Sequence, residues 1–188
     1  MGRSDDELDP PWVARLRARD ADAFGRLVDC YERPMFNVAY RMLGNAAEAA
    51  DATQDVFLKV FENLAAYDPK YRLFSWIYRI AVNEAIDRLK RRMRSDLVAV
   101  DVADLPLASA ERGPEQLADD LQTHDLIQAA LLELPPDHRA VIVLRHFSEC
   151  SYAQMAEILH IPEKTVKSRL YSARQEMRAF LCTRGVAA

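Results

Sequence analysis

The sequence predicts an all-α protein: two small helical domains joined by a flexible acidic linker, the second containing a helix-turn-helix. Apolar residues recur at helical spacing along the 188 residues, whereas long alternating strand patterns and Asn-Gly or Asp-Gly hairpin turns are absent. Half of the residues are hydrophobic, and Gly (5) and Pro (9) are sparse, which excludes collagen-like and wholly disordered classes. We expect the domains at 1–95 and 121–188 and the linker at 96–120.

The first domain is expected to contain four helical segments. Pro34 breaks or restarts the helix between the first and second of them, Gly44 and Asn45 give a stop signal, and a turn follows at 67–69. The segments cover residues 22–31, 35–43, 46–64 and 73–92. Residues 95–120 show no amphipathic period and contain Gly113 next to Pro114, which is typical of a linker.

The second domain is expected to resume the helices near residue 121. One helix runs to residue 134, and two prolines then end it. Asp137 is expected to cap the next helix, at 139–147. The sequence SYAQ at 151–154 is a capping box that opens a short helix.

A helix-turn-helix is predicted between Ser151 and Met177. His160 and Ile161 form its turn, where such motifs prefer glycine, so His160 is expected to need a positive φ. The second helix has an apolar stripe that includes Val166 and Leu170, and hydroxyl and cationic side chains on its other side. Such a helix can enter the major groove of DNA, although an ordinary helical hairpin with a charged outer face is the alternative.

Charge is distributed in blocks along the chain. The net charge of −4 divides into −5 over residues 1–69, +6 over 70–94, −9 over 95–137 and +4 over 138–188. Two basic blocks separated by an acidic stretch indicate two surfaces for one polyanion. Two solvated helix faces are the simpler reading.

Two side-chain groups in the first domain are candidates for binding. Asp51, Gln54 and Asp55 share a polar helix face, which suits a basic partner better than acid–base chemistry, because no pocket residues converge on them. Trp76 and Arg79 lie among aromatic and cationic residues at helical spacing, a combination that suits unstacked single-stranded bases. The alternative places Trp76 in the core.

Enzymatic and redox functions find little support. There is no Gly-rich phosphate loop and no GxSxG motif, and His146 and Cys150 alone do not make a metal site. The three cysteines are far apart, which suits a reducing cytosol rather than a disulfide framework. We therefore expect no catalytic residues, cofactor or metal. We also expect a cytoplasmic location without membrane insertion, because neither a signal peptide nor a spanning segment is evident.

Two motif blocks resemble the extracytoplasmic-function (ECF) group of bacterial sigma factors. The runs DATQDVF at 51–57 and FSWIYRIAVN at 74–83 are similar to sigma region 2. The runs SYAQMAEI at 151–158 and TVKSRL at 165–170, after Leu134, Pro135 and Arg139, are similar to region 4. No segment resembles region 1.1 or domain 3. The resemblance implies a protein that binds core RNA polymerase and directs it to promoters.

The resemblance also implies roles for individual residues. Docking on the clamp coiled coil of the β′ subunit falls to Asp51, Gln54 and Asp55. Contacts to the −10 element fall to Lys70, Tyr71, Arg72, Phe74, Trp76, Arg79, Asn83, Lys90, Arg91 and Arg92. Contacts to the −35 element fall to Thr165, Lys167, Ser168, Arg169, Tyr171 and Arg174. Ser172 departs from the family, since many relatives have a basic residue there.

Partners and regulation follow from the same resemblance. It implies contacts with the β′ and β subunits of polymerase and with promoter DNA, and it places the acidic linker near the active-centre and RNA-exit channels. It also implies regulation by an anti-sigma factor acting in trans, and a stress or envelope-response regulon. The free chain is expected to be a monomer. It is also expected to bind DNA poorly, because its net charge is negative. A stand-alone helix-turn-helix regulator is the alternative function.

Overall fold

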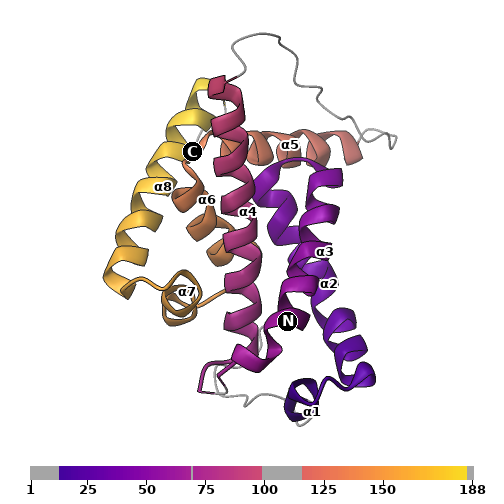
Figure 1. The fold of residues 1–188 in the computed structure, drawn as a ribbon. Coiled ribbons are helices and arrows are strands. Elements are labelled where there is room, and N and C mark those ends of the chain that lie inside the picture. The colour runs from indigo at the N-terminus through magenta and orange to yellow at the C-terminus, as the bar shows by residue number, and fades with distance from the viewer. Residues whose placement is uncertain (1–12, 69, 99–115, 186–188) are drawn as a thin grey trace.

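The structure is a computed structural model that describes residues 13–68, 70–98 and 116–185. All regular elements in these ranges are helical, as predicted (Figure 1). The first domain contains α1 (Val13–Arg17), α2 (Ala21–Leu43), α3 (Ala46–Asn63), the 3₁₀ turn η1 (Leu64–Ala66) and α4 (Leu73–Val98). The second contains α5 (Gln116–Glu133), α6 (Pro136–Ile142), the π-helical turn η2 (Val143–Phe147), α7 (Tyr152–Leu159) and α8 (Glu163–Thr183).

The helix α2 is continuous, so the predicted break at Pro34 is wrong. A proline inside a helix removes one backbone hydrogen bond. Tyr31, Met35 and Val38 are buried on either side of Pro34 and hold both halves of the helix on the core, which offsets that loss. The predicted stop is confirmed: Gly44 ends α2 with φ 78°, and the Asn45 side chain accepts a hydrogen bond from the Glu48 amide to begin α3.

Helices extend into the predicted linker, 96–120, from both sides. Helix α4 extends to Val98 rather than ending near residue 92, and α5 already begins at Gln116. The centre of the predicted linker, 99–115, lies outside the described residues. Residues 93–98 and 116–120 are too few to show an amphipathic period of their own, which is why helical spacing missed them.

Asp137 does not cap the helix after the two prolines. Pro135 occupies the N-cap position without a side-chain hydrogen bond, and Pro136 is the first helical residue, where a missing N–H costs nothing. Asp137 lies in the first turn instead and pairs with Arg169 of α8 at 3.0 Å. The carboxylate therefore joins two helices of the second domain.

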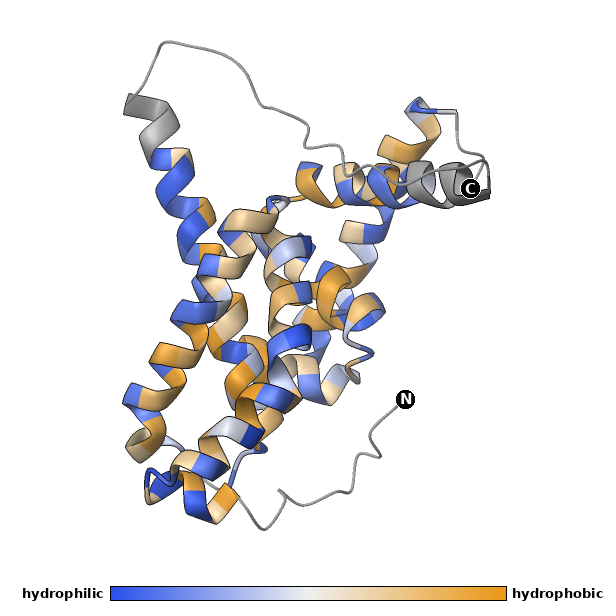
Figure 2. Ribbon diagram, turned by 90° about the vertical axis from the view of Figure 1, so that its right-hand side faces the viewer, coloured by the Kyte–Doolittle hydropathy of each residue, from blue (hydrophilic) through white to orange (hydrophobic). Residues whose placement is uncertain are grey.

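One continuous apolar core runs through both domains. Its members on α2, α3 and α4 pack together, and those on α6, α7 and α8 continue the same cluster. Figure 2 shows apolar and polar residues interspersed along each helix, as expected of amphipathic helices that share a core. Helix α7 packs against α4, and α5 crosses the end of α2 (Figure 1), so the second domain lies directly on the first.

Candidate functional site

The polar face of α3 is open to solvent, as its predicted binding role requires. Asp51 and Gln54 are exposed, and the Asp55 side chain is about half exposed (49%). One Asp55 oxygen accepts a hydrogen bond from Arg88 of α4. The carboxylate is therefore oriented by its own chain, with its remaining lone pairs available to a partner.

A buried carboxylate organises the cations behind this face. Glu84 is 2% exposed and pairs with Lys59 and with Arg88 (2.6 Å), while Arg91 lies at 3.4 Å. Burial alone would raise the pKa of Glu84, but hydrogen bonds from Lys59 and Arg88 outweigh it and hold that pKa below its usual value. Desolvation acts to lower the pKa of Arg88, but its bonds to Glu84 and Asp55 raise it. The network joins α3 to α4.

The aromatic residues around the start of α4 are only partly exposed. Trp76 packs against Tyr67, with ring centroids 5.2 Å apart, and Phe74 contacts Tyr78 at 4.2 Å. Trp76 is half-buried and packs on the core, which is closer to the alternative interpretation than to a fully exposed ring. Tyr71 is the exception, being 50% exposed. Trp76 is half-buried because the ring it packs against, that of Tyr67 directly after η1, is itself buried.

Arg79 of α4 contacts the second domain. Its guanidinium donates to the backbone carbonyl of Glu157 in α7 at 2.7 Å, and its Cζ lies 5.9 Å from the Tyr71 ring centroid. One turn earlier, Ser75 is fully buried, and its hydroxyl donates to the Glu157 carboxylate at 2.9 Å. Helix α7 therefore lies on the part of α4 that the sequence analysis assigned to the −10 element.

The other predicted −10 residues lie along the same segment and farther up α4. Arg72 is half-buried, and the remaining members are exposed: Lys70, Asn83, Lys90, Arg91 and Arg92. The Lys70 amide donates to the Asp68 side chain at 3.0 Å, which shapes the turn before α4. Lys90, Arg91 and Arg92 form an exposed basic tract toward the C-terminal end of α4, which lies at the top of Figure 1.

The predicted helix-turn-helix is present in the second domain. Ser151 and Gln154 form a full capping box at the start of α7. His160 follows with φ 55° and ψ 43°, the left-handed conformation expected of it. Val166, Leu170 and Ala173 are buried against the neighbouring helices, as their spacing predicts. The outer face of α8 is therefore fixed relative to α7.

The predicted −35 residues differ in their exposure and in their contacts with the rest of the protein. Tyr171 is 67% exposed, and Lys167 is exposed with Glu163 at 3.8 Å. Arg169 pairs with Asp137, whereas Ser168 donates back to the Thr165 carbonyl at 3.0 Å. Arg174 is exposed, and its Nη2 lies 3.3 Å from His146 Nε2.

Cysteine and histidine do not form a metal site in the described ranges. No group of three or more metal-ligating side chains occurs there. Burial raises the pKa of the Cys150 thiol to about 12, so the thiol is protonated and inert at neutral pH. Burial, with Arg174 and Arg145 nearby, lowers the pKa of His146. Among the described helices, none is long and apolar enough to span a membrane.

Sequence reasoning missed several residues that join the two domains. Ser75 and Glu157 gave no signal, because a contact between residues 82 positions apart leaves no local pattern. Gln128 is buried and donates weakly to the carbonyls of Tyr40 and Arg41 at the end of α2. Glu84 did leave a signal: it is one of two acids in the basic block at 70–94, and it lies four residues before Arg88.

Comparison with known proteins identifies both domains. Models of Sigma-70 region 2 and Sigma-70, region 4, match residues 27–95 and 124–177. The chain is 33% identical over 173 residues to the ECF RNA polymerase sigma factor SigW of Bacillus subtilis, covering 88% of this chain and 92% of that protein. It is also 33% identical to the RNA polymerase sigma-H factor of Pseudomonas aeruginosa, covering 90% and 91%.

Solved structures share the fold. CnrH in complex with the cytosolic domain of CnrY superposes with a TM-score of 0.69 at 23% identity, covering 94% of this chain and 99% of that chain. RpoE of Bartonella quintana, bound to the anti-sigma factor NepR, gives 0.66 at 24% identity, covering 84% and 96%.

The helical fold and these matches define a transcription-initiation factor. The chain belongs to the sigma-70 family, in its ECF group, whose members direct RNA polymerase to promoters.

Proposed function

We propose that the open face of α3 docks this sigma factor on the clamp coiled coil of the β′ subunit. Asp51 and Gln54 present an exposed carboxylate and amide, and Arg88 holds Asp55 in place beside them. Acceptors fixed before binding lose little side-chain entropy when a basic partner arrives. Further contacts to the β subunit accompany this docking.

The −10 element is bound by α4 and the turn before it. Exposed Tyr71 offers a ring for an unstacked base, and Arg79 and Asn83 supply hydrogen-bond donors one helical turn apart. The basic tract at 90–92 binds the phosphate backbone. The half-buried Trp76 and Phe74 support this surface from below.

The −35 element is bound in the major groove by the N-terminal half of α8. Thr165, Lys167 and Ser168 lie at its entry, and Tyr171 and Arg174 lie farther along the same exposed side. Arg169 contributes through its pair with Asp137, which fixes the angle between α8 and α6. Hydroxyls and cations in this arrangement suit base edges and phosphates.

The cellular role we infer is that of a cytoplasmic monomer, released from an anti-sigma factor to serve a stress or envelope-response regulon. Solved relatives in complex with anti-sigma partners support the regulatory part of this proposal. We also propose domains at 1–95 and 121–188 with a linker at 96–120; the family matches over 27–95 and 124–177 lie within the two domains and support this division.

The proposal depends most on one observation: a single chain carries an aromatic and cationic face on α4 and a hydroxyl and cationic face on α8. The first suits separated strands and the second suits duplex DNA, and promoter opening requires both. Run-off transcription with bacterial core polymerase on pooled genomic promoter fragments tests this. We expect specific transcripts only when the protein is present, and aligned start sites will give the two elements.

Matched variants assign the docking residues in the same assay. Asp51→Ala and Gln54→Ala should lower affinity for core polymerase, whereas Glu32→Ala, an exposed carboxylate on α2, should not. Absence of transcripts, combined with tight duplex binding by the protein alone, would favour a stand-alone regulator instead.

A further inference from the structure

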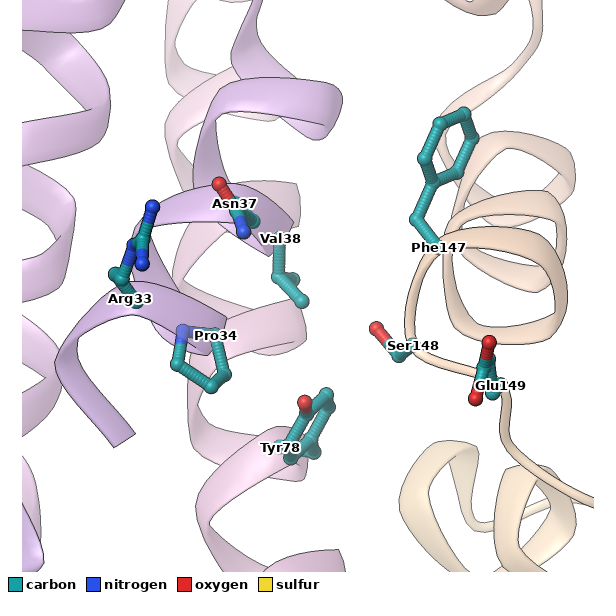
Figure 3. A pocket seen from close by; sticks show the side chains of 8 residues that line it. All are labelled: Arg33, Pro34, Asn37, Val38, Tyr78, Phe147, Ser148 and Glu149. Atoms are coloured by element: carbon teal, nitrogen blue, oxygen red, sulfur yellow. The ribbon is translucent and has the colours of Figure 1, made fainter. Parts of the chain in front are cut away.

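Glu84 is the only buried carboxylate in the described part of the chain, with 2% of its surface exposed. The charged residues at the cleft between the domains are different: Arg33 and Glu149 line opposite sides of this space of about 500 Å³, and both are exposed (Figure 3). Exposed charges of that kind are solvated and contribute little. Burying a carboxylate is costly unless it is paired, so the partners of Glu84 determine what it contributes.

The first partner, Lys59, pairs with Glu84 rather than with Asp55. Lys59 follows Asp55 by four positions on α3, which is the spacing and order at which an acid and a lysine pair along a helix. Helices α3 and α4 lie side by side (Figure 1), and the Lys59 ammonium donates to Oε2 of Glu84 on α4 instead. The buried carboxylate therefore binds a cation that is otherwise placed to pair with Asp55.

The second partner, Arg88, is fixed at one end by Glu84. Its Nε donates to Oε1 of Glu84 at 2.6 Å, and its Nη1 lies 3.5 Å from the Glu48 carbonyl in the first turn of α3. The third nitrogen, Nη2, donates to Oδ2 of Asp55. Each nitrogen of the planar group thus has its own acceptor. A guanidinium released from Glu84 is free to turn and bind both oxygens of Asp55, the bidentate geometry that arginine and carboxylates favour.

Both pairs have the same consequence for Asp55. Its side chain remains 49% exposed, and Arg88 binds one of its two oxygens, so it can still accept hydrogen bonds from a basic partner. Without Glu84, Lys59 and Arg88 would both be available to neutralise Asp55. A partner would then have to displace them, and the cost of breaking those pairs would reduce the affinity.

We propose that Glu84 is a positioning residue for polymerase docking: it binds Lys59 and Arg88 so that Asp55 stays available to a basic side chain of the β′ clamp coiled coil. Glu84 acts only through these two cations, because its own side chain is buried. The inference rests on the docking role proposed for α3, and it adds to that role a residue of α4 that lies behind the docking surface.

The first test measures the affinity of the full-length protein for bacterial core RNA polymerase by biolayer interferometry. Glu84→Gln should weaken binding about fivefold, since residues of one charge network are coupled by this order of free energy. In the Asp55→Ala background the same substitution should change the affinity by less than about twofold, because no carboxylate is left to keep available. A purely structural role of Glu84 would weaken binding equally in both backgrounds.

Removing the released cation gives a rescue that a structural role would not produce. The double variant Glu84→Gln, Lys59→Gln should bind core polymerase about twofold more tightly than Glu84→Gln alone, because Lys59 no longer competes for Asp55. Circular dichroism and a thermal scan establish that each variant is folded at the assay temperature. If Glu84→Gln is not folded there, the double variant, which removes both members of a buried pair, replaces it in the Asp55 comparison. It should weaken binding two- to threefold relative to wild type and cause no weakening in the Asp55→Ala background, by about the same coupling.

Glu62→Gln controls for the loss of one negative charge near the docking surface. Glu62 is an exposed carboxylate on α3, three residues after Lys59. Its substitution should change the affinity by less than about twofold, as expected of an exposed charge. Equal weakening by Glu62→Gln and Glu84→Gln would overturn the proposal, since net charge alone would then explain the loss.

The remaining outcomes separate this inference from the proposed function. Unchanged affinity in Glu84→Gln, or equal weakening with and without Asp55, would overturn the positioning role while Asp51→Ala and Gln54→Ala still weaken binding. Unchanged affinity in Asp51→Ala and Gln54→Ala would instead overturn the docking role of α3.

Discussion

Burial changes the pKa and the reactivity of individual side chains in this protein. The three cysteines show this directly, because Cys30 and Cys182 are exposed and Cys150 is buried with its thiol pKa raised to about 12. Only a thiolate reacts readily with electrophiles. A redox role for Cys150 is therefore not supported by its surroundings.

We expect iodoacetamide at pH 7.5 to alkylate two cysteines of the native protein and all three after denaturation in urea. Intact-mass spectrometry counts the adducts, and peptide mapping assigns them. Rapid modification of Cys150 in the native protein would show that the thiol is more accessible than its position indicates.

Glu84 illustrates the opposite effect, a buried group held in its charged form. Its pKa is lowered, so the folded state binds a proton less tightly than the unfolded chain does. This stabilisation is present above the ordinary pKa of 4.5 and is lost as the pH falls below it through the folded-state value. Glu84→Gln should reduce the free energy of unfolding by about 1–3 kcal/mol at pH 7, leaving three cations without their shared partner.

Urea unfolding at pH 7, 5, 4 and 3 checks this prediction. The difference between wild type and Glu84→Gln should be constant at the two higher values and narrow at the two lower ones. Glu62→Gln, an exposed carboxylate on α3, is the matched control and should differ from wild type by less than about 0.5 kcal/mol at each pH. A pH-independent difference would attribute the effect to packing instead of charge.

At the scale of elements, caps were more predictable from sequence than helix lengths. The capping box of α7 and the left-handed residue before α8 are encoded within four residues, so both were found. The course of α2 through Pro34 was not, because its stability comes from core contacts with other helices. The same limit applies to the candidate site: its positions were assigned on α3, α4 and α8, but the contact of α7 with α4 could not be predicted.

The turn between α7 and α8 provides a test of local strain. A non-glycine residue at φ 55° destabilises the folded state by about 1–2 kcal/mol. Glycine removes this strain, but it loses more conformational entropy on folding, which cancels part of the gain. His160→Gly should therefore raise the free energy of unfolding by about 0.5–1 kcal/mol, and His160→Val should lower it by about 1 kcal/mol. Ala153→Gly, on the exposed side of α7, should destabilise by about 1 kcal/mol and confirm that the gain is specific to the turn. Urea unfolding of the full chain measures all three.

For the molecule as a whole, one buried arginine of α6 joins the ends of two other helices. Arg139 of α6 donates to the carbonyls of Leu132 (2.6 Å) and Leu134 (3.0 Å), at and just beyond the end of α5, and also to that of Met42 in α2. Burial lowers the pKa of Arg139 to about 10, which still leaves it charged at neutral pH. Terminal helix carbonyls lack partners within their own helix, and a cation there also complements the helix dipole.

Replacing this side chain should therefore weaken the association of the domains as well as the second domain itself. Arg139→Met keeps much of the buried volume but leaves three carbonyls without their charged donor, and we expect the free energy of unfolding to fall by about 2–4 kcal/mol. Arg178→Met, exposed on α8, should change it by less than about 0.5 kcal/mol. Urea denaturation at pH 7 gives both values. A loss below about 1 kcal/mol for Arg139→Met would mean that water satisfies these carbonyls, and that the two domains are held together chiefly by their shared apolar core.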